Sequence, residues 1–164
     1  MALVLANLAN ELASMPRGTD PQAAADAWLN AYRDYARLAT ANGVPATPGT
    51  VDGAAEVIRP QVRASFAAQL GIEALERTVM WLWDPAHSLL APNLYFTGAT
   101  ALDVLADGPQ TIAQLLGTTF AANRAAGLGQ AAAMAAIAAD IHNWVTLVAN
   151  VAVTFAGPTV VPLA

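Results

Sequence analysis

The sequence predicts a mainly α-helical protein, a helical bundle that ends in a long C-terminal β-strand or extended arm, with one short additional strand as an option. Alanine, the strongest helix former, occurs 40 times in 164 residues. Apolar residues recur every three or four positions through much of residues 1–144, as on one face of a helix. From residue 145 they recur at every second position, as in a strand. We therefore assign residues 1–144 to a helical body, and residues 145–164 to a strand and apolar tail of the same single domain.

Composition limits the partners and the chemistry to be expected. The net charge is −5, only 12% of the residues are charged, and the seven basic residues are all arginines. Because nucleic acids and anionic lipids attract basic surfaces, we expect no direct nucleic-acid binding. The absence of cysteine excludes disulfides, zinc–thiolate sites and thiol nucleophiles.

The first fifteen residues predict a short amphipathic helix that docks on the body. No Lys or Arg precedes the apolar run, whereas a secretion signal begins with positive charge. Leu5, Leu8, Leu12 and Met15 are spaced so that they share one helix face.

The next helix is predicted from Pro21 to a left-handed stop at Asn42-Gly43, with Thr19 or Asp20 as its N-cap. Trp28, Tyr32 and Tyr35 form an aromatic stripe on one face, opposite a polar face. Such a stripe is typical of core or interface packing, so we expect these three side chains to be buried.

Two further helices are predicted between residues 51 and 82. The first keeps a helical period from Val51 to Leu70, and Pro60 within it must either kink the helix or mark its true start. The second begins at Ile72, and Glu73 is placed four residues before Arg77, which allows an exposed ion pair.

The segment after this helix holds the residues most suggestive of catalysis. Asp84, His87 and Ser88 together resemble the members of a hydrolase triad. A triad, however, requires side chains that converge from separate elements, and the chain has no Gly-x-Ser-x-Gly motif. We therefore expect Asp84-Pro85 to end the helix in a capped turn. The following segment, "NLYFT", is predicted as the short additional strand.

Charge nearly vanishes after Asp107, since only Arg124 and Asp140 follow it. A helix is predicted from a cap at Asp107 or Gly108, with Pro109 in its first turn. An alanine-rich helix follows the "GLG" break. Because Asp140 and His142 are two positions apart on that helix, they do not share a face, and we expect no metal site there.

The C-terminal segment predicts a strand from Val145 to Phe155. Odd positions are apolar, and threonine and asparagine lie between them. Extension toward Asp140 or Pro158 interrupts the apolar run, so we expect no membrane span. A single long strand leaves backbone groups unpaired, and "NLYFT" is too short to match it, so we expect pairing with another subunit or protein. The predicted assembly interface comprises Val145, Leu147, Val151, Val153, Phe155, Val160, Val161 and Leu163.

The alanine-rich helical chain, "YFTG" in its middle, and "FAANRAAGLGQAAAMAAIAADIHNWVTLVANVAVTFAGP" near its end resemble small proteins encoded among the late structural genes of tailed bacteriophages. The resemblance implies a virion component: a head-tail neck, tail or capsid-accessory protein, assembled in the host cytoplasm. It implies copies arranged in a symmetric ring or lattice, in contact with other virion proteins. It implies no enzyme activity, no cofactor and no catalytic residue.

Two other function classes stay open. A helical protein-interaction module would differ from a virion part by forming a stable monomer or heterodimer. A small hydrolase-like enzyme would depend on Asp84, His87 and Ser88.

Overall fold

A computed structural model describes residues 3–16, 20–105, 111–157 and 159–164. Within these ranges the protein is mainly helical, with 61% helix in eight helices and two small antiparallel sheets. The predicted helical class is therefore confirmed. In chain order the elements are α1 Leu5–Ala13, α2 Pro21–Ala36, β1 Thr40–Ala41, β2 Val44–Pro45, α3 Pro48–Ala67, α4 Gly71–Trp81, α5 Pro85–Ser88, α6 Pro92–Tyr95, β3 Ala99–Val104, α7 Ile112–Ala125, α8 Gln130–Val145, β4 Val151–Phe155 and β5 Thr159–Pro162.

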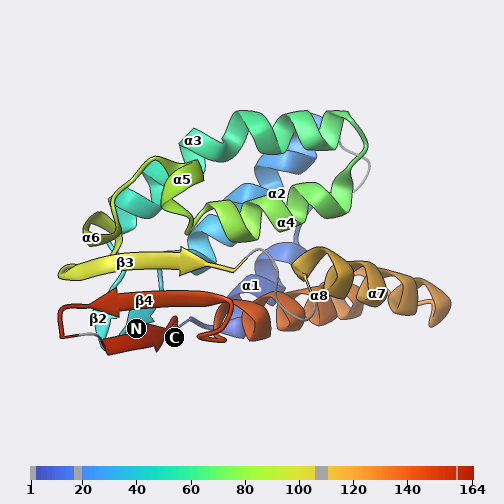
Figure 1. Ribbon diagram of the computed structural model, residues 1–164. Coiled ribbons are helices and arrows are strands. Elements are labelled where there is room, and N and C mark those ends of the chain that lie inside the picture. Colours follow the sequence, from blue (N-terminus) through green and yellow to red (C-terminus); the bar gives the residue numbers. More distant parts are fainter. Residues whose placement is uncertain (1–2, 17–19, 106–110, 158) are drawn as a thin grey trace.

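The helices pack in two connected groups. Helix α2 packs along α3, and α1 packs along α8. Helix α4 links the groups, since it contacts α2 and α3 on one side and α7 on the other. Figure 1 shows β3 and β4 at one end of the molecule and α7 with α8 extending toward the other end.

Local signals set several helix ends. The Asp20 carboxylate accepts hydrogen bonds from the backbone N–H groups of Gln22 and Ala23, at 2.9 and 3.0 Å, as an N-cap does. Helix α7 begins at Ile112, where Thr111 and Gln114 form a capping box, so its start lies later than predicted. The predicted capping residues 107–109 lie outside the described residues, as does Thr19.

The long helix predicted to end at Asn42-Gly43 is shorter than expected. Helix α2 ends at Ala36, and β1 pairs with β2 as a two-residue hairpin. Asn42 and Gly43, at φ 51° and 76°, form its turn, because two successive positive φ angles suit the twist of a hairpin. Pro60 lies inside α3, which excludes the second of the two predicted alternatives, that it marks the helix start.

The C-terminal strand differs from its prediction in bounds and in partners. Helix α8 continues to Val145, and the strand begins only at Val151. It is the central strand of a three-stranded sheet, with β3 on one side and β5 on the other. The predicted unpaired strand is therefore wrong, because strands of the same chain satisfy its backbone groups.

The two strands beside β4 come from segments for which the sequence predicts other structures. The segment "NLYFT" does not form a strand: Pro92 starts the short helix α6, and Tyr95 is buried with its hydroxyl donating to the Leu82 carbonyl at 2.8 Å. The strand follows as β3. The apolar tail forms β5, and Ala164 exchanges two backbone hydrogen bonds with Thr40, at 2.8 and 2.9 Å.

The core between sheet and helices centres on aromatic residues. Trp83 is fully buried, and its indole N–H donates to the Tyr32 hydroxyl at 3.0 Å. That hydroxyl donates in turn to the Val79 carbonyl at 3.2 Å. Trp83 also stacks on Phe96 with the ring centroids 6.0 Å apart. This chain of contacts joins α2, α4 and the segment that leads into β3.

Replacing Tyr32 by Phe tests this polar chain in the core. The substitution keeps the ring but leaves the buried Trp83 N–H without its acceptor, so we expect a loss of about 1 to 3 kcal/mol in the free energy of unfolding. Tyr95→Phe is the matched control, because it removes one hydroxyl donor to a carbonyl but leaves every N–H group with its acceptor. We expect it to lower the free energy of unfolding by about 1 kcal/mol. Urea denaturation measures both, and an equal or smaller loss for Tyr32→Phe would contradict the role given to the Trp83–Tyr32 bond.

Candidate functional site

The eight residues predicted as an assembly interface do not share one surface. Four of them face the protein's own core and are fully or almost fully buried: Val145, Val151, Val153 and Leu163. Phe155 and Val161 are half-buried against that core. Only Leu147 and Val160 are largely exposed. The prediction fails for the buried residues because strict alternation identifies one buried face, and the protein covers that face with its own helices.

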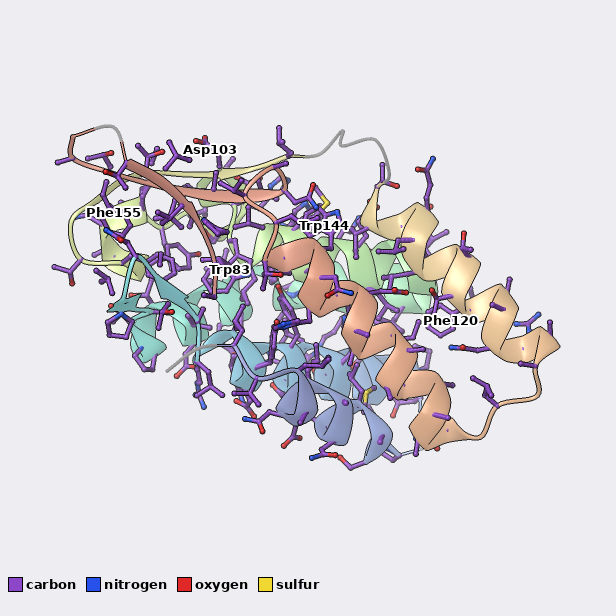
Figure 2. All side chains as sticks on the ribbon, turned by 90° about the horizontal axis from the view of Figure 1, so that it is seen from below. Trp83, Asp103, Phe120, Trp144 and Phe155 are labelled. Carbon is purple, nitrogen blue, oxygen red and sulfur yellow. The ribbon has the colours of Figure 1, made fainter. Side chains whose placement is uncertain are left out.

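One face of the three-stranded sheet has only exposed or half-buried side chains, and we call it the outer sheet face. It consists of Ala101, Asp103, Ala152, Thr154, Val160 and Pro162. The registers Ala101↔Thr154↔Val160 and Asp103↔Ala152↔Pro162 place these side chains on the same side. Figure 2 shows Asp103 at the outer margin of the sheet and Trp83 on the inner side, toward the helices. Asp103 carries the only charge in this face.

A group of exposed aliphatic side chains lies where the sheet meets α8. We call Leu105, Leu147 and Val148 the turn patch; they are 51%, 55% and 46% exposed. Backbone hydrogen bonds hold the group together: the Leu105 N–H donates to the Asn150 carbonyl at 2.9 Å, and the Asn150 N–H donates to the Leu147 carbonyl at 2.8 Å. The side-chain amide of Asn150 is buried and donates to the Trp144 carbonyl at 3.1 Å. The turn patch is therefore an ordered surface, adjacent to the end of β3.

Two strand edges border the outer sheet face. In the described part of the chain, β3 and β5 each pair with β4 alone. The β5 edge carries Pro162, which lacks an N–H group and weakens further pairing. The β3 edge contains no proline and no lysine. It is the edge better suited to accept another strand.

The residues resembling a triad do not form one. His87 Nδ1 lies 2.5 Å from Asp84 Oδ2, and the imidazole stacks on Trp81 with the ring centroids 4.4 Å apart. Ser88, in contrast, is fully buried, and none of the described hydrogen bonds joins it to His87. Asp84 also caps α5 through the Ala86 N–H at 2.9 Å, as the sequence predicts. The cluster therefore brings together an acid and a histidine without a reachable nucleophile.

The aromatic stripe lies in the core, as predicted. Trp28, Tyr32 and Tyr35 are buried almost completely. The Tyr35 hydroxyl lies 2.7 Å from His142 Nδ1 and joins α2 to α8. Burial raises the pKa of Tyr35 and lowers the pKa of His142, so burial favours the neutral form of both side chains in this hydrogen bond.

Most arginines form ion pairs on α2 and α3, a feature that helix periodicity did not reveal. Asp26 accepts hydrogen bonds from Arg63 and Arg59, and these, chiefly those from Arg63, lower its pKa. Asp52 accepts from Arg37 at 2.7 Å, which lowers its pKa likewise. These ion pairs thus lie on two helices that are distant in sequence from the turn patch.

A second feature that sequence reasoning missed is an apolar cavity of about 380 Å³ among the helices. Trp28, Phe66, Leu75, Phe120 and Met134 contribute to its wall, and Arg124 is the one charged residue in the lining. These residues come from α2, α3, α4, α7 and α8. No short sequence window contains them together, so the sequence carried no local signal of the cavity.

Two further kinds of feature are absent from the described ranges. Across residues 3–16, 20–105, 111–157 and 159–164, no three histidine, aspartate or glutamate side chains are placed to bind one metal ion. In the same part of the chain, no helix combines the length and the apolar character that crossing a bilayer requires.

Comparison of the chain with protein-family models, with curated proteins and with solved structures finds no match. The resemblance to phage structural proteins therefore stays a prediction.

The buried contact of His142 predicts a pH dependence of stability. Because the folded protein holds the pKa of His142 below the usual value of about 6.5, the unfolded chain binds a proton more readily. The stabilisation is complete above that value and declines as the pH falls through it. We expect the free energy of unfolding to decrease between about pH 7.5 and about pH 5.5, and to decrease less in His142→Gln. Urea denaturation at both pH values measures the difference; equal decreases in the two proteins would contradict the assignment.

Proposed function

We propose that this protein is a structural component of a tailed-phage virion, a head-tail neck, tail or capsid-accessory protein that works by assembling with copies of itself. The observation that carries the proposal is the weakly charged surface formed by the outer sheet face and the adjacent turn patch. Among the residues that define it, Asp103 alone is charged, and Leu105, Leu147, Val148 and Val160 are exposed aliphatic side chains.

The physical character of this surface supports association. Removing exposed aliphatic side chains from water is favourable, by about 25 cal/mol per Å² of apolar area. Burying a charge without a partner is costly, and this surface contains a single carboxylate. The ion pairs of α2 and α3 lie on other elements, so the proposed interface leaves them solvated.

The open edge of β3 offers a second means of contact. A strand from a neighbour can add to it through backbone hydrogen bonds. Head-to-tail contacts between identical copies, through the turn patch, generate a ring or a helical array. The proposed contact residues are thus Leu105, Leu147, Val148 and Val160 with the β3 edge, in place of the buried half of the predicted interface. Other virion proteins would bind the same assembly in the particle, which forms in the host cytoplasm.

Substitutions at Leu147 test the assembly directly. We expect the purified wild-type protein to have a mass several times the 16.9 kDa of one chain, measured by light scattering after size exclusion. Leu147→Asp places a charge in the turn patch and should weaken association about tenfold or more, shifting the mass toward one chain.

Leu128→Asp is the matched control, because Leu128 is 44% exposed at the link before α8, and the 16 residues of that helix separate it from the turn patch. It should keep the wild-type mass. Point substitutions are preferable to truncation after Asn143, which would remove the buried Trp144, Val145, Val151 and Val153 from the core. A monomeric wild type, or equal masses for all three proteins, would contradict the proposal; a heterodimer with another protein would favour the interaction module.

A further inference from the structure

The cavity among the helices is lined by apolar side chains and a single arginine. Its wall consists of aromatic, aliphatic and methionine side chains, its volume is about 380 Å³, and it is open to solvent on one side; one cation, Arg124, belongs to the lining. A volume of this size corresponds to about thirteen liquid waters at about 30 Å³ each, and it is large enough for a chain of roughly ten methylene or methyl groups of similar size.

Arg124 differs from the arginines of α2 and α3 in its surroundings. Arg33, Arg37, Arg59 and Arg63 each form an ion pair with a carboxylate. Arg124 is exposed near the end of α7, and among the described residues no acidic side chain pairs with it. A guanidinium in an otherwise apolar lining is complementary to an anionic group on an apolar molecule.

Trp28 forms part of the cavity wall, and its side chain is almost fully buried. The two methionines of the lining, Met15 and Met134, are flexible enough to adjust to the shape of a ligand.

The geometry points to a binding site for a small amphipathic carboxylate, a monomeric medium-chain fatty acid, with its apolar chain in the cavity and its carboxylate at Arg124. Ile72 of α4 lies against α7 at the cavity: a Cβ added at Gly117 of α7 would lie 3.7 Å from Ile72 Cδ1, and Ile72 lines the cavity while remaining 37% exposed. Ile72 is therefore a point at which a substitution can obstruct the site without entering the main core. The proposal is independent of self-assembly, because none of the residues proposed for that contact lines the cavity.

Titration of the full-length protein with decanoate, kept below the concentration at which it forms micelles, tests the proposal by isothermal calorimetry and tryptophan fluorescence. Decanol, which has the same chain and no charge, is titrated in parallel. We expect saturable binding of decanoate at one site per chain. Arg124→Gln should weaken decanoate binding about fivefold and leave decanol binding unchanged, because only the head-group contact is lost.

Ile72→Asp and Leu70→Asp form a matched pair at the start of α4. Ile72 is 37% exposed and lines the cavity, whereas Leu70 is 42% exposed and does not. Acidic residues are favourable at a helix N-terminus, so both variants should fold. Ile72→Asp should abolish binding of decanoate and decanol, and Leu70→Asp should retain both. Absence of saturable binding in the wild type, or equal affinities in all variants, would overturn the proposal.

Discussion

Pairing of β4 on both of its edges is the interaction on which the arrangement of the whole protein depends. It joins β4 and β5 to Ala99–Val104 in the middle of the sequence, and the chain end beyond β5 pairs with Thr40. Three distant parts of the chain are thereby fixed against each other. The inward side chains of β4, Val151 and Val153, complete the core beside Trp83 and Phe96. Once these are buried, the alternate residues of the same strands form the outer sheet face.

This division of the strand explains why the surface proposed for assembly carries so little charge. The arginines and their carboxylates are gathered on α2 and α3, where long side chains can pair and remain partly solvated. The sheet contributes alanine, threonine, valine and proline to its outer face and a single aspartate. The charged side chains of α2 and α3 therefore stay partly hydrated, whereas the outer sheet face offers mainly apolar contacts.

The sequence predicted the helices better than the strands, for identifiable reasons. The aromatic stripe of α2 follows a helical period strongly enough to indicate which of its residues are buried. Val145 satisfies two patterns, since it continues the four-residue spacing of Ile137 and Ile141 and also begins the alternation toward Phe155. Tertiary packing resolves the ambiguity in favour of the helix. Strand β3 has only six residues and includes an exposed aspartate, which gives it a weak pattern. The cavity could not be predicted, because its lining residues meet only when five helices have packed.

Hydrogen exchange of the dilute, monomeric protein, resolved by mass spectrometry at the level of short peptides, tests the central claim that β4 is paired within its own chain. If β3 and β5 pair with it as described, the amides of Val151–Phe155 should be protected to a similar degree as those of the buried face of α2. Rapid exchange of these amides in the monomer, with protection only when the protein associates, would show that β4 pairs with a neighbouring subunit. That result would contradict the claim.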